Sequence, residues 1–267
     1  MKGSARLLII AGSDSGGGAG IQADIKTASA LGVYAATAIT AITAQNTQGV
    51  QAAQAVSPEM VARQIRSVLD DIGADAVKIG MLGSARIVQT VATELRDFDG
   101  PVVLDPVMVA KSGDRLLESD AICALIGQLL PRATLLTPNL PEAAQLLDQP
   151  SARSANQICE QGAALKRLGA RAVLMKGGHS PDADCTDWLI SDEPPQHFTS
   201  PRLATSNTHG TGCSLSSAIA AGLSKGASLG EAVHDAHHWL HRAIAQADGL
   251  QIGKGHGPVH HFHEVWA

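Results

Sequence analysis

Aromatic side chains are scarce in this chain of 267 residues, in which three Trp, three Phe and one Tyr make up 3%. A core with so few rings must be filled by small side chains and by close approach of backbones, which is typical of layered α/β enzymes. Glycine is abundant at 27 residues, and the apolar content of 45% is that of a globular protein. We expect a single domain over residues 1–267, because one core can bury about three quarters of the unfolded surface at this length.

An excess of basic residues is also missing. The formal net charge is −5 and the isoelectric point is near 6.1. This balance argues against nucleic acid or an anionic membrane as a partner, because both require a basic face. A small phosphorylated ligand is still compatible with it, since one local site is enough to hold such a ligand.

Cysteine is sparse and widely spaced. Because the four residues form no C-x-x-C pair, they predict reduced thiols in a cytoplasmic protein rather than a disulfide framework or a metal knuckle; they are Cys123, Cys159, Cys185 and Cys213. The apolar run near the N-terminus ends at Ala11, which is too short for a signal peptide. No segment approaches the roughly 18 apolar residues of a membrane span.

Apolar runs alternate with helical patterns along the chain. The expected strands are 7–11, 33–43, 75–82, 101–105, 133–139 and 171–178, followed by short ones at 186–191 and 196–200. The expected helices are 20–31, 57–72, 84–98, 141–148, 155–169, 211–225 and 229–247. Such alternation predicts a mostly parallel sheet covered on both faces. Polar or glycine-rich residues lie at the carboxyl ends of five of these strands or just after them, at 12–20, 80–81, 105, 139 and 177–178, and the carboxyl edge of such a sheet is where ligands bind.

The stretch NTHGTGC, residues 207–213, leads into a helix of small residues. Gly210 and Gly212 permit a tight turn, after which the amides of Thr211, Gly212 and Cys213 would point out of a helix N-terminus. Unpaired donors at such an end favour an anion, for example a phosphoryl group during transfer. A thiol there is expected to have a lowered pKa and to act as thiolate, base or hydrogen-bond partner. The alternative is a plain helix entry with Cys213 as a small buried side chain.

The stretch GSDSGGGAGIQAD, residues 12–24, follows a strand and enters a helix, so its glycines would let backbone amides approach a ligand. Gly18, Gly20 and Ala23 match a loose dinucleotide pattern, but the acidic residue expected about 20 positions later is missing, which argues against a nicotinamide cofactor. The alternative is a flexible turn, with Asp24 as a surface carboxylate of the helix. A Walker-type loop is absent, since the nearest stretch, 249–254, is one residue short and lacks Ser or Thr after its lysine.

Other strand ends carry charged residues. Asp105 could ligate Mg²⁺ or a phosphate-bound water, and Lys111-Ser112-Gly113 could form a loop that closes over substrate. Lys176, before two glycines, can neutralise a nucleotide phosphate. Asn139 and Glu142 have the spacing of a capping box, but Glu142 could equally position water around Mg²⁺, and the spacing does not separate these two interpretations.

A histidine cluster points in another direction. His234 and His238 lie four residues apart, with Asp235 where zinc hydrolases of the H-E-x-x-H type have glutamate. His237 and His241 form a second such pair. Aspartate shortens the base and a third ligand is missing at a suitable spacing, so we expect polar histidines on a helix face rather than a metal site.

Together these motifs resemble the hydroxymethylpyrimidine/phosphomethylpyrimidine kinases of thiamine biosynthesis, in the ribokinase-like superfamily. Eight stretches carry the resemblance in order across nearly the whole chain: AGSDSGGGAGIQADIKT, TAQNTQGV, KIGML, VLDPVMVAKSGDRLL, TPNLPEA, LMKGGH, NTHGTGCSLSSAIAA and GKGHGPVHHFH. The resemblance implies a three-layer α/β/α ribokinase-like fold around a central, mostly parallel sheet, and a homodimer. Sugar kinases of the superfamily have aspartate as the base at the end of this turn. This chain has Cys213 there, and the pyrimidine kinases also have cysteine. Gly16 stands where many relatives have serine.

The resemblance also implies roles for single residues. Gln45 would hydrogen-bond the aminopyrimidine, since its amide both donates and accepts. The other residues implied around the pyrimidine are Gly12, Ala19, Asp24 and Met81. The cofactors implied are ATP and Mg²⁺, with ATP at Lys176, Asn139, Thr208 and Asp105, and the metal at Asp105 and Glu142. The turn Gly210, Thr211, Gly212 and Cys213 is implied to be catalytic.

The implied reaction transfers the γ-phosphoryl group of ATP to the hydroxymethyl group of 4-amino-5-hydroxymethyl-2-methylpyrimidine. A second ATP then converts the monophosphate to the diphosphate. The first alternative is a pyridoxal or pyridoxine kinase of the same fold. Further alternatives from other classes are a zinc hydrolase built on the histidine helix and a non-catalytic sensor of a nucleotide or vitamin.

Overall fold

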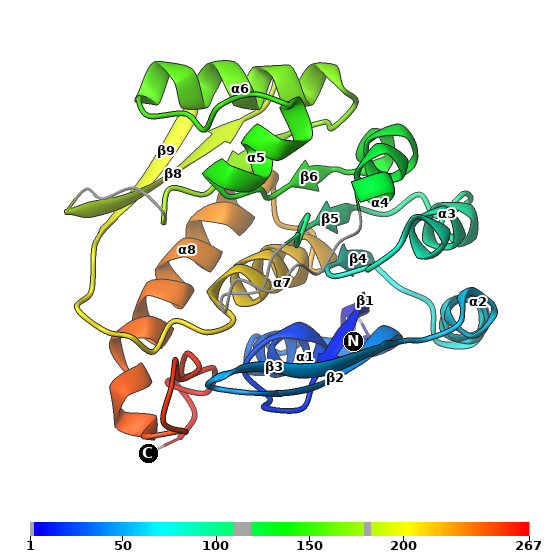
Figure 1. Ribbon diagram of the computed structural model, residues 1–267, viewed down its shortest axis with the longest axis horizontal. Helices are drawn as coiled ribbons and strands as arrows, with labels where there is room; N and C mark the ends of the chain where they lie inside the picture. Colours follow the sequence, from blue (N-terminus) through cyan, green and yellow to red (C-terminus); the bar gives the residue numbers. More distant parts are fainter. Residues whose placement is uncertain (1–2, 109–118, 179–182, 267) are drawn as a thin grey trace.

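A nine-stranded sheet runs through the described part of the chain (Figure 1). The computed structural model describes residues 3–108, 119–178 and 183–266, so the predicted loop Lys111-Ser112-Gly113 lies outside the described residues. The strand order is β3-β2-β1-β4-β5-β6-β7-β8-β9. The strands are β1 (Arg6–Asp14), β2 (Tyr34–Asn46), β3 (Gly49–Ala55), β4 (Ala76–Ile79), β5 (Val102–Leu104), β6 (Leu135–Leu136), β7 (Val173–Met175), β8 (Asp184–Ile190) and β9 (Gln196–Pro201).

The central strands β2, β1, β4, β5, β6 and β7 are parallel, which confirms the predicted mostly parallel sheet. Antiparallel pairs close both ends, β2 with β3 at one end and β7, β8 and β9 at the other. In β1, Leu8 and Ile10 face one core cluster while Leu7 and Ile9 face the other, and all four are buried. A strand that is apolar on both sides requires helices on both faces of the sheet.

Helices supply those two layers (Figure 1). One core cluster includes side chains of α1 (Gly20–Ala30), α7 (Thr211–Ser224) and α8 (Leu229–Ala245). The other includes side chains of α2 (Pro58–Ser67), α3 (Ala85–Glu94), α4 (Ser119–Ala124), α5 (Leu140–Leu147) and α6 (Ala155–Arg167). Short π or 3₁₀ turns follow at Val68–Ile72, Leu125–Leu129, Leu130–Arg132 and Ala247–Leu250. The three-layer α/β/α arrangement is therefore the expected one.

Two elements were absent from the sequence-based expectation. Strand β3 carries mainly Ala and Gln, and most of its side chains are exposed, so it has neither strand propensity nor an alternating pattern. The helical stretch from α4 to Arg132 includes π and 3₁₀ turns, and Gly127 and Pro131 interrupt its pattern. The start of β3 lies beside the end of β2, where Gln45 pairs with Val50.

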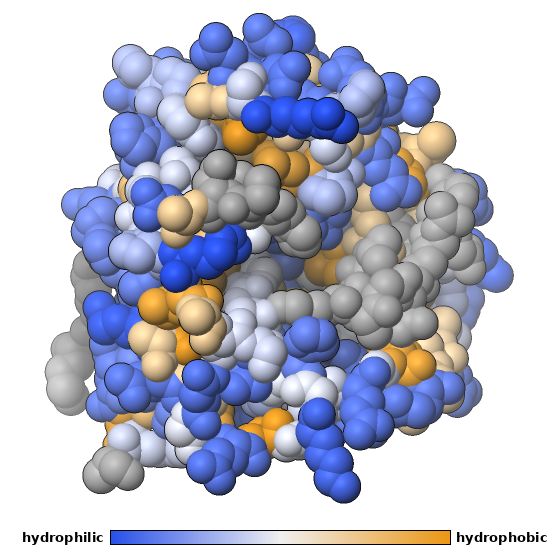
Figure 2. Space-filling view, turned by 60° about the vertical axis from the view of Figure 1, so that its left-hand side comes forward, coloured by the Kyte–Doolittle hydropathy of each residue, from blue (hydrophilic) through white to orange (hydrophobic). Residues whose placement is uncertain are grey.

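Within the described residues, no helix is both long and apolar enough to cross a bilayer. Figure 2 shows one face of the molecule, where hydrophilic side chains dominate and hydrophobic ones gather in small separate groups. Scattered apolar residues of this kind are ordinary on a protein surface.

Candidate active site

Five neighbouring parallel strands end at the same edge of the sheet. They are β1, β4, β5, β6 and β7, and the polar or glycine-rich residues predicted at strand ends lie at or within a few residues of their carboxyl ends. Helix α7 packs against β1, β4 and β5, so its N-terminus belongs to the same region. The predicted convergence of five strand ends is therefore confirmed.

The turn before α7 is built on Gly210, which caps the helix with a left-handed backbone, φ 81°. A Cβ added to Gly210 would lie 1.8 Å from the carbonyl oxygen of Gly18, so only glycine fits where the two loops touch. Ser214 N donates to Gly210 O at 2.8 Å, and among the described side chains none caps the helix. Helix geometry leaves the amides of Gly212 and Cys213 without acceptors inside α7, available to an anion.

A lysine and a carboxylate stand directly against this turn. Lys176 Nζ lies 2.8 Å from Asp105 Oδ1, and a Cβ added to Gly212 would be 3.3 Å from Lys176 Nζ and 3.7 Å from Asp105 Oδ2. Burial alone would raise the pKa of Asp105, but Lys176 and Lys78 hold it below its usual value. Against the effect of its own burial, Lys176 has a raised pKa because Asp105 and Glu142 face it. The turn, the lysine and the ionised carboxylate thus form one site.

Glu142 combines the two interpretations of its motif. Asn139 N donates to Glu142 Oε2 and Glu142 N donates to Asn139 Oδ1, both at 2.8 Å, which confirms the capping box at the start of α5. Burial raises the pKa of Glu142 to about 7, the negative charge of Asp105 adds to the shift, and Lys176 opposes it. Two mutually repelling carboxylates fit Mg²⁺, which proteins often hold through one or two carboxylates together with substrate phosphates.

The thiol of Cys213 does not have the lowered pKa expected at a helix N-terminus. Burial raises the pKa of Cys213 to about 11, Asp24 and Asp105 add to the rise, and Lys78 opposes it. The expectation considered the helix end alone, whereas desolvation and two carboxylates dominate in the fold. Cys213 is half-buried at the mouth of the turn and is a thiol at neutral pH.

Asp24 is not the surface carboxylate that its position in a helix suggested. Both Asp24 and Lys78 are fully buried, and Lys78 Nζ lies 2.9 and 2.8 Å from the two oxygens of Asp24. Ser217 Oγ donates to Asp24 Oδ1 at 2.7 Å. The structure thus places Asp24 beneath α7 and in contact with Lys78 and Ser217.

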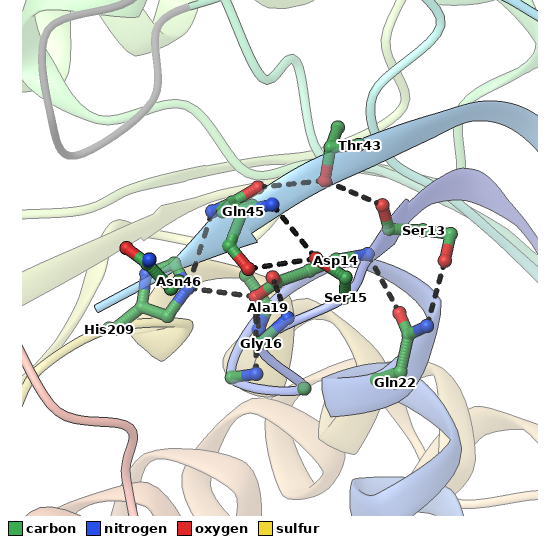
Figure 3. A network of polar contacts seen from close by, with 12 residues as sticks. Ser13, Asp14, Ser15, Gly16, Ala19, Gln22, Thr43, Gln45, Asn46 and His209 are labelled. Atoms are coloured by element: carbon green, nitrogen blue, oxygen red, sulfur yellow. Dashed lines mark hydrogen bonds and ion pairs between the residues drawn. The ribbon is translucent and has the colours of Figure 1, made fainter. Parts of the chain in front are cut away.

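The glycine-rich loop after β1 surrounds a carboxylate of its own (Figure 3). The amide of Gly16 donates to Asp14 Oδ1 at 2.8 Å, and those of Gly18 and Ala19 donate to Asp14 Oδ2 at 3.1 and 2.8 Å. His209 Nε2 lies 2.9 Å from the same Oδ2. Burial would raise the pKa of Asp14, but the His209 and amide hydrogen bonds lower it. The expectation that these amides face a ligand is therefore wrong for these three, because Asp14 already accepts from them.

Gln45 lies beside this loop at the end of β2. Its Nε2 is 3.4 Å from His209 Nε2, and Thr43 Oγ1 is 3.2 Å from its Oε1 (Figure 3). A cavity of 280 Å³ opens here, lined by Gln45, Asn46, Thr47, Gln48, Gly49, His209 and His256. On the other side of β1, a Cβ added to Gly12 would lie 2.4 Å from Met81 Cε. The predicted residues Gln45, Gly12, Met81 and Ala19 therefore gather around the end of β1.

Sequence reasoning missed Asp14, His209 and Lys78. The first two lie inside motifs that were singled out, GSDSG and NTHGTGC, so an ionisable residue beside glycines was the available signal. Thr208, expected near ATP, lies on the approach to the turn, where Thr211 N donates to its carbonyl at 3.4 Å. Lys78 gave no signal, because a lysine within a strand is usually solvated.

The histidine helix lies outside this site. His234 is exposed beside Asp235, whereas His237 is buried, with its Nε2 4.0 Å from Asp187 Oδ2, so the expected polar histidines are solvated at His234 and enclosed at His237. Burial, together with the charges of the neighbouring histidines, lowers the pKa of His237 to about 4. Within the described residues, no group of three or more His, Cys, Asp or Glu is arranged to hold a metal ion.

An open anion turn beside a lysine and a carboxylate, at the carboxyl edge of a doubly wound sheet, defines a phosphotransferase of the ribokinase-like fold. The chain belongs to the phosphomethylpyrimidine kinase family, whose model matches residues 14–260. It is 55% identical over 260 residues to a hydroxymethylpyrimidine/phosphomethylpyrimidine kinase of Salmonella typhimurium, covering 97% of this chain and 98% of the relative.

Two solved structures are similar. Phosphomethylpyrimidine kinase of Clostridium difficile has a TM-score of 0.80 and 39% identity, over 90% of this chain and 100% of the other. The ADP complex of Bacillus subtilis pyridoxal kinase has a TM-score of 0.89 and 35% identity, over 97% of this chain and 98% of the other. The shared fold thus spans kinases named for two different substrates, phosphomethylpyrimidine and pyridoxal.

Proposed function

We propose that this chain phosphorylates 4-amino-5-hydroxymethyl-2-methylpyrimidine with ATP, first to the monophosphate and then to the diphosphate, in thiamine biosynthesis. The observation that carries the proposal is the contact of Gly18 with Gly210, which brings the pocket around Gln45 against the anion turn. The 55% identity to an enzyme named for this double activity supports the choice of substrate. The homodimer and the cytoplasmic location expected from the sequence are part of the proposal.

The residues divide the work as follows. Gln45, Gly12, Ala19 and Met81 orient the pyrimidine beside the end of β1, and Asn139 and Thr208 contact ATP. The amides of Gly212 and Cys213 receive the negative charge that develops on the transferred group, and Lys176 assists them. Losing one such donor typically costs about 10²–10³ in rate.

Asp105 and Glu142 would hold Mg²⁺, which neutralises charge on the nucleotide phosphates when it is bound. In the first transfer the hydroxymethyl oxygen must lose its proton, and the thiolate form of Cys213 accepts it. The nucleophile of the second transfer is a phosphate oxygen that is already ionised near neutral pH, because its second pKa is about 6. The second transfer therefore needs no base.

The test is product analysis after incubation of the purified chain with Mg·ATP and the pyrimidine alcohol. We expect the monophosphate to appear first and the diphosphate to follow, each identified by mass. The matched reaction with the monophosphate as the only acceptor must give the diphosphate directly. ATP consumption without either product contradicts the proposal.

A pyridoxal kinase remains the second candidate, favoured by the TM-score of 0.89 to the Bacillus subtilis enzyme. Both candidate activities need an anion-binding turn and a pocket that holds the aromatic ring of the substrate. A parallel incubation with pyridoxine separates them, since we expect kcat/KM to be higher for the pyrimidine alcohol. A second phosphate is expected only on the pyrimidine.

A further inference from the structure

Lys78 is a fully buried lysine for which the mechanism above has no use. Its side chain, like that of Asp24, is 0% exposed, although β4 is otherwise apolar. An ion pair taken out of water is seldom a net source of stability, because desolvation offsets the attraction between the charges. A buried pair next to an active site therefore calls for another explanation than stability.

The pair lies directly beneath the start of α7. Ser217, which donates to Asp24, is one helical turn after Cys213 and on the same face of α7. Lys78 Nζ lies under the end of β4, since a Cβ added to Gly80 would be 2.9 Å from it. The ammonium group is thus fixed between β4, α1 and the helix that carries Cys213.

Four charged groups act on Cys213 from the surrounding elements: Lys78 on β4, Asp24 on α1, Asp105 after β5 and Lys176 after β7. The amide of Gly20 also favours the thiolate. Lys78 is the strongest of the influences that favour the thiolate. Its own pKa stays above the usual value despite its burial, because Asp24, Cys213 and Asp105 face it.

We infer that Lys78, held by Asp24, is a positioning residue whose buried charge makes the thiolate of Cys213 accessible as the base of the first phosphoryl transfer. This inference rests on the proposed function. In that step the substrate oxygen forms a bond to the γ-phosphorus, and the bond from that phosphorus to the β–γ bridging oxygen breaks, with ADP keeping the electron pair. The hydroxyl proton moves to the sulfur and gives the thiol.

The test measures the thiolate without any substrate. In a Cys123→Ser/Cys159→Ser/Cys185→Ser background, Cys213 is the only thiol, and its alkylation by iodoacetamide at pH 8 reports the thiolate. The double variant Lys78→Met/Asp24→Asn removes both charges together, which avoids leaving either one buried alone. The single variant Asp24→Asn is the matched control, because it removes the carboxylate and keeps the lysine.

We expect alkylation to slow about threefold in the double variant, because a pKa higher by about one unit is partly offset by greater nucleophilicity. In Asp24→Asn it must instead become faster. Folding is checked by circular dichroism, and if the double variant fails to fold, Asp24→Asn alone decides. Unchanged rates, or rates that move in the same direction in both variants, overturn the inference.

Activity supplies a readout that a purely structural role would not reproduce. The double variant must lose rate in the first transfer and keep the rate of the second, starting from the monophosphate. Equal losses in both transfers contradict the inference. If the parent protein forms neither product, the proposed function fails. The difference in alkylation rate between the two variants tests the inference without any substrate and so does not depend on that result.

Discussion

The pH dependence of the two transfers gives the sharpest test of the role of Cys213. With a pKa of about 11, only about one thiol in 10⁴ is ionised at pH 7. The thiolate is the active form, so its fraction rises tenfold with each pH unit below the pKa. Raising the pH from 7 to 9 must therefore speed the first transfer about 100-fold.

The second transfer serves as the internal reference. Its nucleophile, a phosphate monoester with a second pKa of about 6, is ionised throughout this range, so its rate is expected to change by less than about twofold. Each transfer is followed by rapid quench under single-turnover conditions, so that chemistry limits the rate. Cys213→Ala must remove the slope of the first transfer, whereas Cys159→Ala, on α6, must leave it intact.

Two results would refute this reasoning. If both transfers rise equally with pH, the slope belongs to a group that they share and not to a base for the hydroxyl. If Cys213→Ala keeps the slope, another residue takes the proton, and Cys213 only fills space at the turn.

Three other changes test separate parts of the structure. Gly210→Ala must lower the rates of both transfers by about 10²–10³, since its Cβ would lie 1.8 Å from Gly18 O and displace the turn amides. Gly226→Ala is the control and must keep activity, because Gly226 has the same left-handed backbone but no described atom within 4 Å of the added Cβ. Gln45→Leu must raise KM for the pyrimidine alcohol about tenfold while KM for ATP stays constant, as steady-state kinetics will show. Burial lowers the pKa of His261 to about 3, so folding favours the neutral ring, and stability present above pH 6.5 is lost as the pH falls toward 3. Urea unfolding must therefore show a loss of about 2 kcal/mol between pH 7 and pH 5 that His261→Gln reduces.

Local signals allowed most of the fold to be predicted. Helix α2 begins at Pro58 with Ser57 as its cap, at the start of the range expected from the sequence, and the apolar runs became the parallel strands. Strand β3 escaped because exposed Ala and Gln carry no periodic signal. Its pairing with β2 depends on tertiary contacts that propensity does not encode.

The candidate site was predicted where neighbouring residues determine it. The glycines of the turn and the capping box of Asn139 are local features, and both have the expected geometry. The pairing of Lys78 with Asp24 joins residues 54 positions apart, and the pKa of Cys213 depends on burial, so neither follows from spacing. The hydrogen bonds from the loop amides to Asp14 could not be predicted either, because they form only when the loop folds back over the end of β1.

The contact between Gly18 and Gly210 sets the distance between the pyrimidine pocket and the anion turn. Because the carbonyl oxygen of Gly18 packs directly against Gly210, the loop beside the pyrimidine pocket and the turn that binds the phosphoryl group are held at a fixed distance. A first acceptor ends in a hydroxyl group, whereas the second is longer by one phosphate, yet both must bring an oxygen to the same point. In the second transfer the pyrimidine ring must therefore bind farther from the turn than in the first. One rigid site can serve both substrates only if the pocket accepts the same ring in two positions.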